Sequence, residues 1–532
     1  MRGTVIQFVL TLVFKFSLGN PNFLLIIVDD LRPALGCYSD WKSFTPNIDE
    51  LARKGITFNN AYAQQALCAP SRNSLLTSRR PDTLGLYDFY SYWRETTGNF
   101  TTLPQYLKDH GYTTMSVGKV FHPGISSNNS DDSPYSWSRE AFHPYTNRYK
   151  DSPLCTSEDD RLPARNLVCP VDVSSMPRGT LPDIENFEAA KEFLNNYKNN
   201  ITNTHGETPF FLALGFEKPH IPLKHPKKYL SYHPLDKFTL NDYYWPDNIS
   251  SVAYNPWTDL RKREDVEKLN LTFPWEKIPE NFGKKILQSY YSAVSYIDEL
   301  IGGLMSETKK LGLDKNTVVI LTSDHGWSLG EHSQWGKYSN FEVAVRVPLI
   351  VSLPNSHQRI NLKSNAIVEL VDLFPTIAEL SGNPIKLCPK NHSGIVCSEG
   401  ISFVPVCNAV SQNKIINWKR GGFSQYPRPG VSPTWSPNSD EPRLHQIKIM
   451  GYTLRTKHYR YTAWVKFDVL RMTSDWNKFI ADELYDHTKD PHEMINQANN
   501  TDYRKTRIKL KKLLKSGWRR SLPRNYFQLG KR

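Results

Sequence analysis

Three short apolar runs, each ending near polar residues, constrain the fold of this 532-residue chain more than any other feature. They are residues 23–28 (FLLIIV) before Asp29 and Asp30, residues 210–214 (FFLAL) before His220, and residues 318–321 (VVIL) before Asp324. Runs that are apolar at every position are typical of strands buried on both faces of a sheet. We therefore expect a central sheet with polar side chains at its strand ends.

Helix signals lie between these runs. Thr45-Pro46 can begin a helix that Gly55 ends, and apolar residues recur at helical spacing before Gly312, namely Ile286, Tyr290, Val294, Ile297, Ile301 and Leu304. Strands that alternate with helices predict an α/β domain with a largely parallel sheet. Ligands of such sheets gather beyond the carboxyl ends of the strands, which is where the Asp and His residues fall.

The pattern changes after about residue 410. Residues 426–442 are rich in Pro and Ser, and strand-like runs follow at 451–455 and 459–464. We predict a large domain over 20–410, a smaller α+β domain with an antiparallel sheet over 416–502, and a basic tail over 503–532. Two domains also agree with the length of the chain.

The N-terminus and the cysteines indicate a secreted glycoprotein. Residues 1–19 are typical of a signal peptide, with a basic start, a short apolar stretch and a small-residue exit. Seven Asn-x-Ser/Thr sequons follow, at Asn99, Asn128, Asn200, Asn248, Asn270, Asn391 and Asn499. Cys155/Cys169 and Cys388/Cys397 are close pairs in polar segments, where disulfides are plausible. Cys37, Cys68 and Cys407 remain.

The net charge of +13 is concentrated at the C-terminus. Residues 504–532 hold twelve Lys or Arg and no acidic residue, whereas residues 20–503 hold 52 basic and 53 acidic residues. No nucleic-acid motif accompanies this charge, and no apolar run after the N-terminus reaches the length of a membrane span. The tail alternates basic and apolar residues, which predicts polyanion binding; a solvated tail agrees equally well with the pattern.

Asp29, Asp30 and Asp324 end two of the predicted strands. Adjacent side chains of a strand point to opposite faces, so both aspartates reach one point only where the backbone turns. Three carboxylates gathered in one place repel each other unless a cation is present, and hard oxygen ligands suit Ca²⁺ or Mg²⁺. The alternative is that each carboxylate caps a helix or pairs with an arginine.

Cys68-Ala69-Pro70-Ser71-Arg72 places a cysteine at the expected start of a helix. A lone cysteine is usually a small buried apolar residue, but this five-residue context resembles the signature of the sulfatase family. The resemblance implies that a formylglycine-generating enzyme converts Cys68 to Cα-formylglycine during secretion. It extends to other segments in order along residues 20–500, namely 29–33, 64–72, 118–124, 218–222, 254–257, 323–327, 337–341, 424–429 and 448–452.

The resemblance implies an alkaline-phosphatase-like α/β/α sandwich with one Ca²⁺. The implied ligands are Asp29, Asp30, Asp324, His325 and the formylglycine at Cys68. The implied activity is that of the family members that remove the 2-O-sulfate from non-reducing-end L-iduronate of heparan and dermatan sulfate, in lysosomes or after secretion. A hydroxyl of the hydrated aldehyde would attack sulfur and form a covalent sulfated intermediate, which the second hydroxyl releases.

The positions that match the family's remaining site residues are Arg72, Lys119, His122, His220 and Lys337. Arg72, Lys119, His220 and Lys337 are expected to stabilise the charge of the transferring group, and Arg72 could equally pair with the metal-binding carboxylates. Lys337 or His220 is expected to protonate or shield the leaving oxygen, and His122 to take a proton. Without the resemblance, the histidines fit rigid proline turns and the lysines fit solvated surface charges. Trp327 fits either a sugar-facing wall or the core.

Three other functions stay open. One is a phosphatase or phosphodiesterase of the same superfamily, generally with two zinc ions and a Ser or Thr nucleophile. Another is a binding protein for sulfated glycans that has lost turnover. A third is a sulfatase that acts on another sulfated position.

Overall fold

The computed structural model describes residues 20–156, 162–203, 208–240, 243–246, 248–354, 360–390, 395–435 and 439–523. The predicted signal peptide and the Asn391 sequon lie outside these ranges. The asparagines of the other six sequons are all exposed. No helix of the described residues is both long enough and apolar enough to cross a membrane.

The three apolar runs form neighbouring strands of one eight-stranded sheet. β1 (Asn22–Val28) lies between β5 (Phe210–Phe216) and β7 (Thr317–Ser323) and pairs with both in parallel. The strand order is β10-β2-β11-β7-β1-β5-β3, and β12 pairs with β2. The outer strands are β2 (Ile56–Tyr62), β3 (Thr113–Gly118), β10 (Arg346–Val347), β11 (Leu349–Ser352) and β12 (Leu362–Glu369). Only β10 and β11 run antiparallel to their neighbours, so the prediction of a largely parallel sheet is confirmed.

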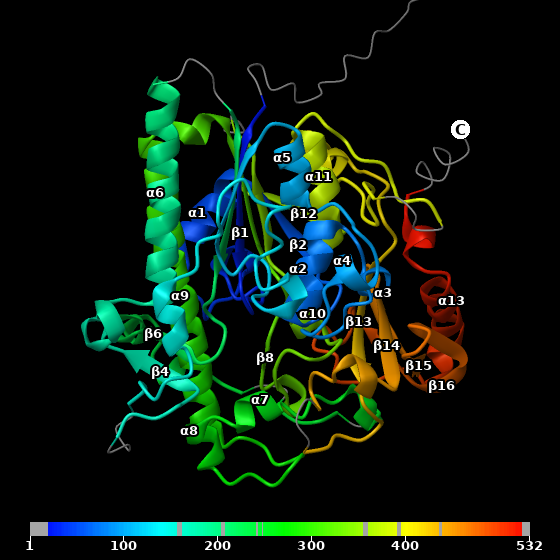
Figure 1. Ribbon diagram of the computed structural model, residues 1–532. Coiled ribbons are helices and arrows are strands. Elements are labelled where there is room, and N and C mark those ends of the chain that lie inside the picture. The colour runs from blue at the N-terminus through cyan, green and yellow to red at the C-terminus, as the bar shows by residue number, and fades with distance from the viewer. Residues whose placement is uncertain are drawn as a thin grey trace, which may run out of the picture.

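Helices cover both faces of this sheet (Figure 1). Alternate residues of β1 belong to two separate cores. Leu24, Ile26 and Val28 belong to the core with α1 (Pro46–Lys54), α6 (Pro182–Asn203) and α9 (Glu280–Lys310). Phe23, Leu25 and Ile27 belong to the core with α2 (Cys68–Thr77), α5 (Leu103–Asp109), α11 (Leu373–Leu380) and α12 (Val404–Ser411). The α/β/α sandwich is therefore confirmed, and both predicted helices are present as α1 and α9.

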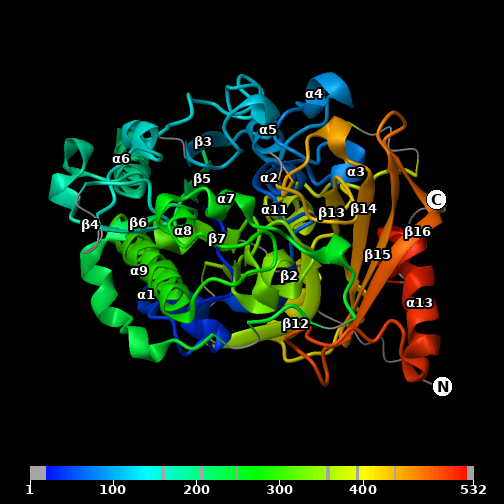
Figure 2. The same ribbon diagram turned by 90° about the horizontal axis from the view of Figure 1, so that it is seen from below.

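A second sheet of four antiparallel strands follows. Its order is β13 (Gly422–Arg428), β14 (Ile449–Arg455), β15 (Tyr459–Asp468) and β16 (Thr473–Asp486). Figure 2 shows α13 (Arg504–Lys515) on the side of this sheet that faces away from the large one. The predicted antiparallel sheet is confirmed, and the first part of the predicted tail is a helix packed against it.

The remaining elements are short. They are α3 (Pro81–Leu84), α4 (Trp93–Thr96), β4 (Val168–Val171), β6 (Leu223–Pro226), α7 (Thr258–Arg261), α8 (Glu264–Glu267), β8 (Ser328–Leu329), β9 (Trp335–Gly336) and α10 (Glu342–Val345).

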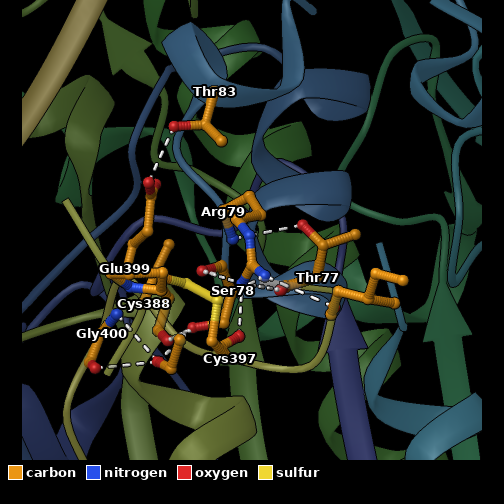
Figure 3. Close-up of a disulfide and its surroundings, with 12 residues drawn as sticks. Thr77, Ser78, Arg79, Thr83, Cys388, Cys397, Glu399 and Gly400 are labelled. Carbon is orange, nitrogen blue, oxygen red and sulfur yellow. Dashed lines mark hydrogen bonds between the residues drawn. A yellow bond between two sulfur atoms is a disulfide. The ribbon is translucent and has the colours of Figure 1, made fainter. Parts of the chain in front are cut away.

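Both predicted disulfides are present, Cys155–Cys169 and Cys388–Cys397. The second closes a loop against the end of α2 (Figure 3). Arg79, just after α2, donates to the Cys397 carbonyl, and Ser78 Oγ lies 2.8 Å from Ser398 Oγ. The loop thereby fixes the C-terminal end of the helix whose first residue is Cys68.

Candidate active site

Asp29 and Asp30 occupy the carboxyl end of β1, where the backbone turns. The Asp29 amide still donates to the Phe216 carbonyl of β5, at 3.0 Å. Asp30 then adopts a left-handed conformation with φ of 59°, and its amide donates to Asp324 Oδ1 at 3.1 Å. This turn lets both carboxylates reach one point, as the argument from strand geometry required.

Cys68 is the first residue of α2 and is buried, with its sulfur toward the strand ends. Its Sγ lies 2.9 Å from Lys337 Nζ, 3.4 Å from His325 Nε2 and 3.5 Å from Asp29 Oδ1. The pKa of the thiol is raised to about 12, mainly by burial and then by the nearby Asp29 charge, against the opposing effect of the Lys119 ammonium. The unmodified thiol is therefore protonated and a poor nucleophile.

Four of the five predicted metal ligands come together. Asp29, Asp30, Cys68 and His325 each bring one ligand atom to within 4.8 Å of the others. The carboxylate of Asp324 lies beside them, but it accepts from the Asp30 and His325 amides and from Arg72 Nε. Asp324 thus orders the cluster as well as adding its charge.

This cluster fits a divalent cation. Asp30 Oδ2 is buried and has no hydrogen-bond partner within the described residues, which is costly unless something binds it. The Asp30 pKa is raised to about 7, mainly by burial, with the Asp29 and Asp324 charges adding to the rise and the Lys337 ammonium opposing it. A bound cation would relieve both the repulsion and the unpaired oxygen.

His220 and His325 share one tautomer. His325 Nδ1 lies 3.0 Å from the Gly326 carbonyl, and His220 Nδ1 lies 2.6 Å from the Ile221 carbonyl. A carbonyl only accepts, so both Nδ1 atoms carry hydrogen and both Nε2 lone pairs are free. His325 Nε2 faces Cys68 and Asp30 Oδ1, and His220 Nε2 is 3.9 Å from Asp30 Oδ2. This is the arrangement that metal-binding and proton-accepting imidazoles need.

Two lysines flank the sulfur from different loops. Lys119 follows β3, and its Nζ lies 2.5 Å from Asp29 Oδ2 and 3.7 Å from Cys68 Sγ. A Cβ at Gly215 would lie 2.0 Å from the Lys119 carbonyl oxygen, so only glycine allows this close approach. Lys337 follows β9 and also contacts Asp30 Oδ1 at 3.0 Å. Both ammonium groups point inward, and neither is a solvated surface charge.

Arg72 lies in the first turns of α2 and is fully buried. Its Nη2 lies 2.8 Å from Asp29 Oδ1 and its Nε 2.9 Å from Asp324 Oδ2, while Nη1 donates to the Lys119 carbonyl. These contacts occupy the guanidinium with protein groups. Arg72 therefore fixes the two carboxylates relative to the Cys68 helix.

His122 and Trp327 contact aromatic and apolar neighbours, and the Lys337 ammonium lies over the Trp327 ring. His122 stacks on Phe89 with ring centres 4.3 Å apart, and its buried Nδ1 has no hydrogen-bond partner within the described residues. Burial lowers its pKa well below the usual value, and the Lys119 charge lowers it further, so the ring is neutral. Trp327 is buried in the core shared with α9, which favours packing over a sugar-facing role.

Sequence reasoning missed an acidic group beside Lys337. Tyr338 OH donates to Asp259 Oδ2 at 3.0 Å, and Thr258 Oγ1 donates to Asp440 Oδ2 at 2.7 Å. The neighbouring Glu441 has a pKa raised to about 8 by burial and by the Asp259 charge, with Lys337 opposing the shift. No motif marks these residues, because positions 258–259, 338 and 440–441 are far apart in the sequence and meet only in the folded chain.

Comparisons with known proteins agree with this geometry. A family model described as Sulfatase matches residues 21–383. Iduronate 2-sulfatase of Mus musculus is 47% identical, covering 91% of this chain and 91% of its own. Iduronate 2-sulfatase of Homo sapiens is 46% identical, covering 90% and 92%. Among solved structures, a phosphonate monoester hydrolase from Silicibacter pomeroyi superposes with a TM-score of 0.68 at 19% identity, covering 95% of this chain and 96% of its own.

Proposed function

Because the chain belongs to the sulfatase family, we propose that it hydrolyses the 2-O-sulfate of non-reducing-end L-iduronate in heparan and dermatan sulfate. Its similarity to two mammalian iduronate 2-sulfatases over about nine tenths of each chain supports this substrate. The observation that carries the proposal is the position of Cys68, whose sulfur lies among two lysines, His325 and the aspartates.

We propose that Cys68 acts as Cα-formylglycine and that the cation is Ca²⁺. Carboxylates and an imidazole are present, but a thiol is a soft ligand that Ca²⁺ does not favour. Conversion replaces this sulfur by oxygen, a hard ligand, which would join the carboxylates of Asp29, Asp30 and Asp324 and the imidazole of His325. The cation supplies positive charge to a sulfate oxygen, and the hydrated aldehyde supplies two hydroxyls, one to attack sulfur and one to release sulfate.

The lysines stabilise the charge of the transferring group. The ammonium groups of Lys119 and Lys337 lie 3.7 Å and 2.9 Å from the sulfur of residue 68. Burial lowers the Lys337 pKa, but the Asp30 charge and others outweigh this and raise it, so the group stays cationic. Fixed cations in a water-poor site are effective for this purpose.

The histidines act as neutral bases. Burial lowers the His220 pKa well below its usual value, and nearby lysines lower it further. With Nδ1 donating to a carbonyl, His220 can accept a proton at Nε2 but has none there to give. We therefore assign the hydrogen bond to the leaving oxygen to Lys337, and proton acceptance to His122 and His220.

The sequons and the disulfides support a place in the secretory route. Six exposed asparagines in sequons and two disulfides agree with a glycoprotein of the secretory route. We propose the lysosome as its destination, with export as the alternative, and the formylglycine-generating enzyme as its partner during secretion.

The test is substrate competition between defined compounds. Purified protein should release sulfate from a disaccharide with terminal L-iduronate 2-sulfate far faster than from its N-sulfated or 6-O-sulfated counterparts. A phosphate monoester and a phosphonate monoester of a simple alcohol are the controls. Preferred cleavage of either would favour the phosphatase class, and preference for another sulfate position would overturn the proposed substrate.

A further inference from the structure

The helix α13 presents a row of lysines to solvent. Lys505, Lys509, Lys512 and Lys515 are all exposed, and each is three or four residues from the next, so they share one face. Ile508 lies on the same face and is 60% exposed. We name Lys505, Ile508, Lys509, Lys512 and Lys515 the outer lysine row. Residues 504–523, which end the described part of the chain, include no acidic residue that could neutralise the outer lysine row.

The opposite face of α13 is fully used by packing. Leu510 and Leu514 are buried in a core with strands of the small sheet. Arg507 forms a two-pronged contact with Asp482, at 2.6 and 2.9 Å, and Lys511 Nζ lies 3.6 Å from the centre of the Phe479 ring. The apolar side is thus unavailable for insertion into a membrane, which leaves charge as the means of attraction.

Helix stability does not account for the row. Lysines at the C-terminal end of a helix are favourable, which covers Lys512 and Lys515. Arg504 and Lys505 lie in the first turn, where the helix dipole disfavours cations. Lys505 and Lys509 are also four residues apart, a spacing at which like charges repel. Neither Arg504 nor any lysine of the row forms an ion pair within the described residues.

We propose that the outer lysine row binds the sulfated glycosaminoglycan chain at a point remote from the cleaved end. A linear polyanion matches a straight row of cations, and such contacts are electrostatic and sensitive to salt. The choice of glycan rests on the proposed function, whereas the binding itself needs no turnover. The row would retain long chains near the site without contacting the reacting sulfate.

The test compares two variants of equal charge. The first changes all four lysines of the row to Gln, which keeps helix propensity; the control carries Lys227→Gln, Lys285→Gln, Lys309→Gln and Lys315→Gln, at exposed sites elsewhere. On a heparin column the row variant should elute at clearly lower salt than the control. The slope of log Kd against the logarithm of the salt concentration should fall by up to about one for each lysine removed. Equal elution of the two variants would overturn the proposal.

Two further measurements separate the outcomes. The row variant should lose several-fold in kcat/KM on long heparan sulfate chains and nothing on the disaccharide. The heparin experiment repeated in a Cys68→Ala background should give the same elution, so a failure of catalysis cannot mimic a failure of binding. Binding to phosphatidylserine vesicles is the competing outcome. If the wild type binds such vesicles more tightly than it binds heparin, and the row variant no longer does, the assignment to glycan is contradicted.

Discussion

Two clusters in the molecule bury carboxylates, basic groups and a histidine but pair them differently. The first, which we call the catalytic cluster after the proposed function, contains Asp29, Asp30, Cys68, Asp324, His325 and Lys337. The second, which we call the junction between the two sheets, contains Glu342, Arg455, Arg460, His487 and Glu493. At the junction, Glu342 of α10 and Glu493, which follows β16, have a hydrogen-bond donor on every carboxylate oxygen. In the catalytic cluster, Asp30 Oδ2 has none within the described residues. The two junction carboxylates are therefore paired at every oxygen, whereas the buried Asp30 oxygen is costly unless a ligand binds it.

The two histidines show the same difference in their tautomers. His487 Nε2 lies 2.8 Å from Glu493 Oε1, so this nitrogen donates a hydrogen bond. His487 Nδ1 accepts a hydrogen bond from the Arg455 guanidinium. His325 has the reverse arrangement, with Nδ1 donating and the Nε2 lone pair turned toward the site. Although Glu342, His487 and Glu493 are close enough to hold a metal, the histidine has no lone pair left for one.

The pKa values follow the same division. Burial raises the Glu493 pKa, but the Arg460 and His487 contacts outweigh it and hold the pKa well below the usual value. Burial and repulsion instead raise the Asp30 pKa to about 7 despite Lys337. Each cluster should therefore respond differently to the loss of a partner, and substitutions can test this.

The largest expected effect is from Cys68→Ala. Loss of the nucleophile should lower kcat on the order of 10⁶-fold, by analogy with other nucleophile deletions, with little change in melting temperature. Sulfate release and thermal unfolding measure the two quantities. Cys407→Ala, at a buried free cysteine outside the site, is the control and should keep kcat. Retained turnover in Cys68→Ala would refute the proposed mechanism.

Arg460→Met should break the junction. Its removal leaves Glu493 buried without its main partner, and such losses cost about 3–5 kcal/mol of unfolding free energy. Urea unfolding measures this cost, and kcat per folded molecule should stay unchanged. A normal stability with reduced kcat would show that the junction is functional after all.

Lys337→Met should lower kcat and leave the stability nearly unchanged, which is the opposite of the result expected for Arg460→Met. We expect a fall in kcat of about 10²–10³-fold, the usual cost of one charge-stabilising contact. Stability should change little, because Asp30 can keep a proton or bind the cation. If the variant instead unfolds readily and its folded fraction turns over normally, Lys337 is structural.

Calcium should stabilise only the catalytic cluster. At a concentration one hundred times its Kd, a ligand that binds the folded state alone adds about 2.7 kcal/mol. The rise in melting temperature with Ca²⁺ should vanish in Asp30→Asn and persist in Glu493→Gln, measured relative to each calcium-free variant. An equal shift in both variants would contradict the location of the ion.

The smallest effect concerns pH. Glu441 is neutral below its pKa of about 8 and ionised above it, so it adds negative charge beside Lys337 as pH rises. Because the substrate is an anion, kcat/KM should fall by about tenfold per pH unit above pH 8 if this one proton governs binding. Glu441→Gln should remove that limb of the profile. An unchanged limb would assign it to another group.

Most of the catalytic cluster could be predicted from the sequence, because its residues stand in short motifs next to predicted strands and a predicted helix. Asp29, Asp30 and Asp324 follow apolar runs that are typical of buried strands, and Pro70 predicts the helix that begins at Cys68. The junction and the acidic group around Glu441 could not be predicted, because their members are far apart in the sequence and no motif links them. The tautomers and the contacts of Arg72 depend on side-chain geometry that no spacing encodes. In the tail, the pattern predicted an amphipathic segment but could not show that Leu510 faces the sheet.

The central claim is that residue 68 acts as an aldehyde and not as a thiol. Its most direct test is the mass of the tryptic peptide of residues 55–72 from freshly secreted, active protein. The account predicts a peptide that is lighter by the difference between a cysteine and a formylglycine. The fraction of this lighter peptide should rise in proportion to the specific activity of each preparation. Full activity in protein whose peptide keeps the mass of unmodified cysteine would contradict it.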